Sequence, residues 1–317
     1  MITLEKLTSN TMDIFKKLYD RNFLNENYDK DFFSLYNNQN FVIKFLFRKF
    51  LKLIRYNDEV IGYIWYDTPL ESTIRIWSLY IENDYMGFID ENTLKAFNTS
   101  ILSYEAIDNP RNTKILTKLG FKRIRPTILM ELNLNKYNRY KDINEIKLKL
   151  QLENSYVNKI YNSIFNTNYI SSKYNNKKFI IGKDEALRCK IQNNIFSTWN
   201  REPLKIEDIY SDISQEYYLK DLSLFGMIND KFVGYGQVIY NRNMYTVVNF
   251  GIINEFRGFG IGKLLLHDLI VSSKSKGFNK LYIRVDEDNI SAQKLYKWAG
   301  FVDKCTISRW DRGYKNY

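Results

Sequence analysis

Alternating and helical patterns of hydrophobic residues predict a strand–turn–helix–strand–helix segment near the C-terminal end. The run from Tyr245 to Ile253 is β-like, and the run from Lys263 to Ile270 has the spacing of an amphipathic helix. A second strand is expected at Leu281–Val285, with another helix before Gly300-Phe301. Between the first strand and its helix lies a glycine-rich stretch, Arg257-Gly258-Phe259-Gly260-Ile261-Gly262.

The same pattern recurs earlier in the chain. Three segments have counterparts in the same order at a nearly constant offset: Asn57–Tyr63 and Asn229–Tyr235, Asn109 with Gly120-Phe121 and Asn289 with Gly300-Phe301, and the helix-like Met12–Phe23 and Glu185–Phe196. The first pair predicts two β-hairpins with Asn-Asp turns. We therefore expect two copies of one fold in tandem, one in residues 1–140 and one in residues 141–317, the second with its core starting at about residue 178.

The segment between the copies is harder to place. Ile146–Leu152 alternates apolar with polar residues, which predicts a half-buried strand, and Tyr156–Phe165 has helical spacing. These two elements could belong to the first copy or bridge the two, and the sequence leaves both alternatives open.

The glycine-rich stretch has the composition of an anion cradle. Glycines let the backbone approach a phosphate, and free N–H groups at a helix start point towards it. The spacing differs from the G-x-G-x-x-G of dinucleotide folds, and Leu264 occupies the position where a Walker loop needs Ser or Thr.

The pattern Arg-x-x-Gly-x-Gly resembles the coenzyme A pyrophosphate loop of the GNAT acyltransferases. Asn289 and Tyr296, after the second strand, resemble a further signature of that family. The resemblance implies an α/β (α+β) protein with two tandem GNAT-like domains, each a mixed, mostly antiparallel, twisted sheet flanked by helices. A degenerate copy before an intact one is similar to tandem GNAT proteins of the mycothiol synthase type.

The resemblance also implies an activity, transfer of an acetyl group from acetyl-CoA to an amine. It assigns cofactor contacts to the strand end, the loop, the helix start and the Asn: Ile252, Ile253, Arg257, Gly258, Phe259, Gly260, Ile261, Gly262, Lys263 and Asn289. Tyr296 is the expected general acid, because a phenol can protonate a leaving thiolate. Asn289 could equally cap its helix. The alternative is a non-catalytic acyl-CoA sensor or interaction module.

The first copy lacks the residues of the loop. Met86, Ile89 and Glu91 stand where the second copy has Arg257, Gly260 and Gly262, and Leu116 replaces Tyr296. Side chains and negative charge at these positions oppose phosphate binding. We therefore expect the cofactor in the second copy only, and a structural role for the first.

The general base is not identified by the sequence. The strand before the loop contains no Glu, and Asn249 lies near the position where a general base is expected. The amine could instead lose its proton to water or to a carboxylate from Glu202, Glu207 or Asp208. Glu255 is expected to face solvent. The residues Asp208, Asp212 and Glu216 recur every four positions. Such a stripe could hold a cationic acceptor, or simply face solvent.

Composition and charge indicate a folded protein and limit the partners that we expect. The 317 residues are 44% hydrophobic, which supports folded domains, and carry a net charge of +11 without a block of consecutive basic residues. We expect a small-molecule or peptide amine acceptor, and neither nucleic acid nor membrane as a partner. Two cysteines, Cys189 and Cys305, and the single His267 predict a cytoplasmic protein without a metal site. The oligomeric state is not indicated.

Overall fold

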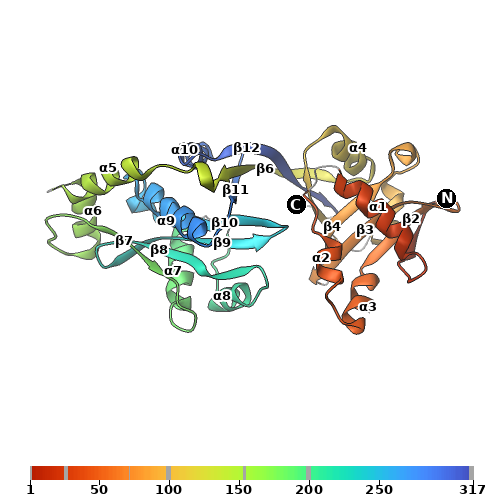
Figure 1. Cartoon of the computed structure of the whole chain (residues 1–317), viewed down its shortest axis with the longest axis horizontal. Coiled ribbons are helices and arrows are strands. Elements are labelled where there is room, and N and C mark those ends of the chain that lie inside the picture. The colour runs from red at the N-terminus through yellow and green to blue at the C-terminus, as the bar shows by residue number, and fades with distance from the viewer. Residues whose placement is uncertain are drawn as a thin grey trace. The chain divides into compact units, whose positions relative to one another are not determined.

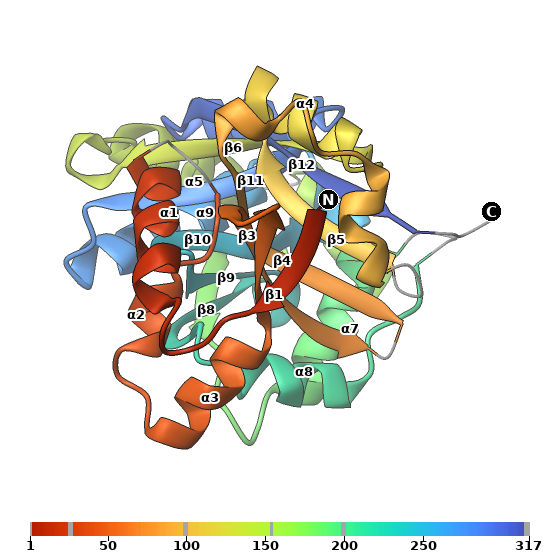
Figure 2. The same cartoon turned by 90° about the vertical axis from the view of Figure 1, so that its right-hand side faces the viewer.

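The computed structural model describes residues 2–24, 28–70, 72–97, 101–152, 155–197 and 201–313. They form two compact units, one made of residues 1–128 with 305–317 and the other of residues 129–304 (Figure 1). Figure 2 shows the strands and helices of the first unit from a second direction. The first unit therefore consists of two stretches of the chain.

The first unit is a sheet with the strand order β1-β2-β3-β4-β5-β12-β6. Its elements are β1 (Ile2–Lys6), α1 (Met12–Leu24), α2 (Phe32–Tyr36), α3 (Phe41–Lys49), β2 (Leu51–Tyr56), β3 (Glu59–Leu70), β4 (Thr73–Ile81), the 3₁₀ helices η1 (Asn83–Tyr85) and η2 (Glu91–Phe97), β5 (Ile101–Ile107), α4 (Pro110–Lys118), the start of β6 (Lys122–Asn133) and the end of β12 (Val302–Arg312). Strands β4 and β5 are parallel, and the pairs β1–β2, β2–β3, β3–β4 and β5–β12 are antiparallel.

The second unit has the strand order β6-β11-β10-β9-β8-β7. Its elements are the end of β6, η3 (Leu134–Lys136), α5 (Tyr140–Gln151), α6 (Tyr156–Phe165), β7 (Tyr174–Lys178), α7 (Glu185–Phe196), α8 (Ile206–Ile213), β8 (Tyr218–Ile228), β9 (Lys231–Asn241), β10 (Met244–Ile252), η4 (Asn254–Phe256), α9 (Ile261–Ser275), β11 (Lys280–Asp286), α10 (Ile290–Trp298) and the start of β12. The order β4-η1-η2-β5-α4 in the first unit matches β10-η4-α9-β11-α10 here, as the sequence repeat predicts.

The two predicted hairpins are present with the same geometry. Asn57 has φ 52° and Asn229 has φ 51°, a left-handed conformation that Asn tolerates better than most residues. Each occupies the first position of a two-residue turn, because Tyr56 pairs with Glu59 and Ile228 pairs with Lys231.

Glycines on β9 allow α9 to pack tightly on the sheet. A Cβ at Gly236 would lie 2.8 Å from Leu269 Cδ1, and one at Gly234 would lie 2.4 Å from Ile252 Cδ1 and 3.2 Å from Leu265 Cδ2. Leu265 and Leu269 are fully buried on α9. This close packing fixes the start of α9 relative to β10, which matters for the site described below.

The prediction of a strand at Ile146–Leu152 is wrong, because these residues lie in and just after helix α5. The buried residues of α5 are Ile143 and Leu150, and Leu148 is 63% exposed. The helical spacing of the buried positions therefore prevailed over the local alternation. Helix α6 has the predicted bounds, and both helices belong to the second unit.

The C-terminal strand completes the first unit. Residues Ile307–Arg312 of β12 pair antiparallel with Leu102–Ile107 of β5. Arg123 Nε donates to Ser308 Oγ (2.8 Å), and Ser308 Oγ donates to Asp108 Oδ2 (2.7 Å). The domain division at residue 140 thus describes the repeat in the sequence, whereas strand pairing joins Ile307–Arg312 to the first unit.

Candidate active site

Strand β10 carries a bulge where it diverges from β11. Its parallel pairing with β11 is confined to Thr246↔Tyr282 and Val247↔Ile283. On the β9 side the register shifts between Val248 and Gly251, and Asn249 has φ 51°. One extra residue bends the strand. The second half of β10 therefore leads away from β11 and into the glycine-rich loop.

Two of the three glycines in this loop adopt left-handed conformations. Gly258 has φ 86°, and Gly260, which is the N-cap of α9, has φ 82°. Gly262 is helical, and a Cβ there would meet Leu295 Cδ2 at an ordinary 3.5 Å. The conformation thus requires Gly258 and Gly260, whereas Gly262 has room for a small side chain.

The loop presents backbone donors at the start of a 15-residue helix. Among the described residues, no backbone carbonyl or side chain accepts the N–H groups of residues 258–262, and the first donors used are those of Lys263 and Leu264, which bond to the Gly260 carbonyl. Free amides combined with the positive end of the helix dipole favour an anion here.

The Arg257 guanidinium bonds to two backbone carbonyls near the loop. Its Nε donates to the Ile252 carbonyl (2.8 Å), and its Nη2 donates to the Ile195 carbonyl (2.8 Å). The guanidinium therefore ties the end of β10 to the end of α7.

Tyr296 lies on α10 with its ring near the diverging strand. The ring centroids of Tyr296 and Phe250 are 6.2 Å apart, and the side chain is 7% exposed. Burial raises the pKa of the phenol well above its ordinary value of 10. Within the part of the chain that the structure describes, its hydroxyl has no hydrogen-bond partner. Tyr296 is thus a protonated group with a free O–H.

The other residues predicted to contact the cofactor lie on β10, α9 and α10 or next to them. Ile252 and Ile253 are buried at its start, and the Asn289 side chain caps α10 by accepting the Ala292 N–H (3.1 Å). No partner of the Asn289 carboxamide nitrogen is found among the described residues. The Lys263 ammonium lies 4.5 Å from the centre of the Trp298 ring, one turn into α9.

Residues 190–301 match the Acetyltransferase (GNAT) family model, and this range contains the bulged strand, the loop and Tyr296. The second unit carries a GNAT domain. Over 73 residues the chain is 37% identical to the [Ribosomal protein bS18]-alanine N-acetyltransferase of Haemophilus influenzae. That segment covers 23% of this chain and 49% of the enzyme, so the chain spans about half the length of this relative.

Solved GNAT structures share the fold over the whole chain. The GCN5-related N-acetyltransferase from Sphaerobacter thermophilus has a TM-score of 0.63 at 12% identity, covering 99% of this chain and 97% of its own. A tandem GNAT protein from the clavulanic acid biosynthesis pathway has a TM-score of 0.55 at 11% identity and is covered completely, as is this chain. The predicted fold of two tandem GNAT-like domains is confirmed.

The segment of the first unit that corresponds to the glycine-rich loop has a different structure. The short 3₁₀ helix η2 occupies the place of α9, and Met86 and Ile89 are buried in the core. Asp90 Oδ1 accepts the N–H groups of Asn92 (2.9 Å) and Thr93 (3.2 Å). These bonds satisfy amides that a phosphate would otherwise take, and hydrogen bonding by Asn92 lowers the pKa of Asp90.

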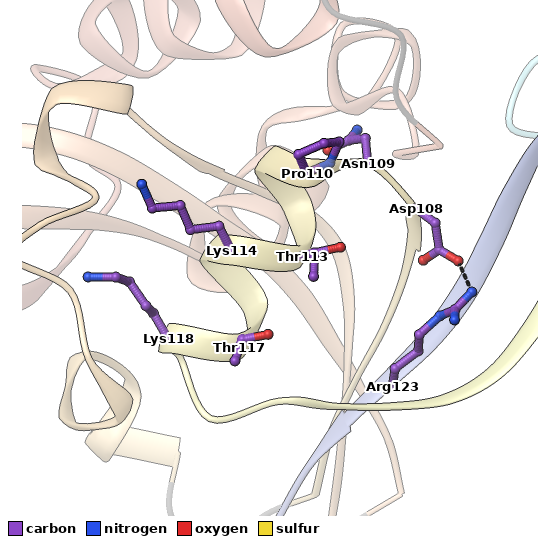
Figure 3. Close-up of a pocket in the computed structure, with 8 residues that line it drawn as sticks. All are labelled: Asp108, Asn109, Pro110, Thr113, Lys114, Thr117, Lys118 and Arg123. Carbon is purple, nitrogen blue, oxygen red and sulfur yellow. Dashed lines mark hydrogen bonds and ion pairs between the residues drawn. The ribbon is translucent and has the colours of Figure 1, made fainter.

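A surface depression of about 680 Å³ lies in the first unit instead, beside α4 (Figure 3). It is lined by Asp108, Asn109, Pro110, Thr113, Lys114, Thr117, Lys118 and Arg123. Arg123 forms an ion pair with Asp108, and the side chains of Lys114 and Lys118 extend away from that pair. Because this pair also holds Ser308, its observed role is to fasten β12 to the sheet.

The acidic stripe expected in the GNAT domain does not form on one helix face. Helix α8 ends at Ile213, so Glu216 lies beyond it. Asp208 caps the helix by accepting the Lys205 N–H (2.7 Å). Asp212 forms an ion pair with Arg188 of α7. The three carboxylates therefore have separate environments.

Sequence reasoning missed the buried polar cluster around Arg188. Its side chain is 1% exposed; Nε donates to Gln192 Oε1 (2.9 Å), and the guanidinium lies 5.0 Å from the centre of the Tyr235 ring. Asp212 also accepts from Tyr217 and Gln237. The partners come from α7, α8 and β9, so no local sequence pattern could reveal the cluster.

The other potentially reactive side chains, His267 and Cys189, form hydrogen bonds with other residues of the protein. His267 is buried, with Nδ1 2.9 Å from the Tyr137 hydroxyl, and burial lowers its pKa. Burial also raises the pKa of Cys189, whose thiol donates to the Leu204 carbonyl. In the described ranges, no three His, Cys, Asp or Glu residues are grouped as metal ligands, and no helix is long and apolar enough to cross a membrane.

Proposed function

We propose that the GNAT domain transfers an acetyl group from acetyl-CoA to an amine. The observation that carries the proposal is the bulged β10 leading into a loop of free amides, with the free hydroxyl of Tyr296 near the same strand. Acetyl-CoA supplies the activated thioester. The residues of the chain hold it, orient it and provide the proton for its leaving sulfur.

The loop fits a pyrophosphate. Amides of residues 258–262 would donate to its oxygens, and Lys263 would add positive charge. The half of β10 that has left β11 would bond the amide groups of the pantetheine as an added strand does. Ile252 and Ile253 would form the apolar side of this path, and Asn289 would contact it from the N-terminus of α10.

Tyr296 is assigned the acid role. The attacking amine forms the new C–N bond, the C–S bond breaks, and the phenol donates its proton to the thiolate. An ordinary phenol is already protonated at neutral pH, as this role requires, and the burial that raises the pKa of Tyr296 makes it a weaker acid. Described residues of β10 include no carboxylate, so the amine would lose its proton to water or to an exposed carboxylate such as Glu207.

The acceptor is proposed as a small-molecule or peptide amine. The similar Haemophilus enzyme is named for an alanine of a ribosomal protein, which makes a peptide with N-terminal alanine a reasonable first acceptor to test. We place the reaction in the cytoplasm, in keeping with two free thiols.

The test is release of coenzyme A from acetyl-CoA, measured with the full chain and a panel of amines: polyamines, amino acids, amino sugars and peptides with free N-termini. Mass spectrometry of the products should show acetylated amine, and Tyr296→Phe should remove most of the activity. Tight binding of acetyl-CoA without transfer to any amine would instead favour the acyl-CoA sensor.

Calorimetry provides a second test. We expect one molecule of coenzyme A per chain, because the first unit fills its loop with Met86 and Ile89 and uses its amides internally. A stoichiometry of two would refute the assignment of binding to the second unit alone.

A further inference from the structure

Helices α5 and α6 lie outside the range that matches the GNAT family model, yet they pack against the phosphate loop (Figure 1). The side chain of Ile146 on α5 lies where a Cβ at Gly260 would point, 2.8 Å away from it. The rings of Phe165 on α6 and Phe256 on η4 stack with centroids 6.2 Å apart. The two helices thus form one wall of the loop.

Helix α6 is held firmly in this position. Val157 and Asn158 are buried, and Tyr161 donates a hydrogen bond to Asp230 at the β8–β9 turn. The helix begins at Tyr156, whose side chain is 69% exposed. An aromatic ring of this size on a fixed helix is an exposed flat surface.

That surface lies directly beside the anion cradle. The ring centroids of Tyr156 and Phe259 are 5.7 Å apart, with an angle of 37° between the planes. Phe259 stands between Gly258 and Gly260, whose N–H groups are among the free donors. A ligand whose phosphates occupy the cradle would have its next group within reach of this ring pair.

From this geometry we infer that Tyr156 and Phe259 form a stacking site for the adenine base of coenzyme A. This inference rests on the proposed function, because it takes the pyrophosphate to lie on the loop amides. A purine is planar and apolar on its faces, and aromatic side chains bind it by stacking. The added helices α5 and α6 would thus extend the GNAT site from the pantetheine and pyrophosphate to the nucleoside.

The test compares two ligands that differ in the adenosine part. Calorimetry of the full chain would measure Kd for coenzyme A and for 4′-phosphopantetheine, in the wild type and in Tyr156→Ala. We expect the variant to bind coenzyme A about 5- to 20-fold more weakly, the lower part of the range for losing a stacked base. Its affinity for 4′-phosphopantetheine should change less than 2-fold.

Control variants separate stacking from damage to the fold. Tyr156→Phe keeps the ring and should bind coenzyme A like the wild type. Tyr210→Ala removes a tyrosine on α8 that is 50% exposed and should leave Kd unchanged. Fluorescence of etheno-coenzyme A gives an independent readout, because stacking quenches the modified base and Tyr156→Ala should restore its emission.

The outcomes distinguish this inference from the proposed function. If wild-type protein binds coenzyme A but Tyr156→Ala binds it equally well, the stacking site is refuted and the function stands. The same holds if the variant loses affinity equally for both ligands. If wild-type protein binds neither acetyl-CoA nor coenzyme A, the proposed function fails and the stacking site fails with it.

Discussion

Substituting Gly260 by alanine tests whether α5 and the loop depend on each other. At φ 82° any side chain is strained, and the left-handed conformation costs about 1–2 kcal/mol. The new methyl group would also lie 2.8 Å from Ile146 Cγ2, too close without a shift of that side chain. Overpacking of this kind typically costs about 1–3 kcal/mol.

Gly258 provides the matched control. Its φ is 86°, but apart from its two chain neighbours no described residue has an atom within 4 Å of a Cβ built there. Gly258→Ala should therefore lose only the conformational part, about 1–2 kcal/mol. The difference between the two variants measures the contact with Ile146.

A double-mutant cycle completes the experiment. In an Ile146→Ala background, Gly260→Ala should cost about as much as Gly258→Ala, because the opposing methyl group is gone. Hydrogen exchange of peptides covering α9 gives a local free energy of opening, which avoids assuming that both units unfold together. Equal costs for Gly258→Ala and Gly260→Ala, or an unchanged cost for Gly260→Ala in the Ile146→Ala background, would refute the reasoning.

Three further predictions concern the GNAT domain. Tyr296→Phe should lower kcat about 10²- to 10⁴-fold and leave the Kd of acetyl-CoA nearly unchanged; full activity with a validated acceptor would rule out its acid role. Asp212→Asn leaves the buried Arg188 guanidinium without an anionic partner and should destabilise the domain by about 3–5 kcal/mol in hydrogen exchange, whereas the exposed Asp208→Asn should cost about 1 kcal/mol or less. Because burial lowers the pKa of His267 below 6.5, its contribution to stability is present above pH 6.5 and is lost as the pH falls towards the folded-state pKa. His267→Gln should therefore show a smaller drop in Tm between pH 7.5 and 5.5 than the wild type, and an equal drop would contradict this.

Elements with strong local patterns could be predicted from the sequence. Helices α6 and α7 have the predicted bounds, and both Asn-Asp turns are present, because apolar spacing and turn residues act locally. The prediction of a strand at Ile146–Leu152 was wrong because tertiary packing, which the local pattern does not show, determines the structure of this segment. Ile143 and Leu150 are buried and Ile146 contacts Gly260 of the loop, and this packing selects a helix over the local alternation.

In the candidate site, too, features set by local sequence could be predicted, and contacts made by the fold could not. The loop glycines could be identified because positive φ at Gly258 and Gly260 needs that residue type. The partner of the Arg257 guanidinium could not, because the Ile195 carbonyl is 62 residues away and only the fold brings it near. Likewise, the hydrogen bonds from the Asn92 and Thr93 N–H groups to Asp90 depend on the loop conformation of the first unit, which no local sequence pattern predicts.

The pairing of β12 with β5 has a consequence for synthesis on the ribosome. Ser308 and Asp108, which this pairing joins, are 200 residues apart, so the first unit is incomplete until β12 has been translated. At about 5–20 residues per second, the nascent chain spends roughly 10–40 s with the β5 edge lacking its final strand. An open edge is a template for wrong pairing, so this interval is when the nascent protein is most exposed to aggregation and most in need of chaperones.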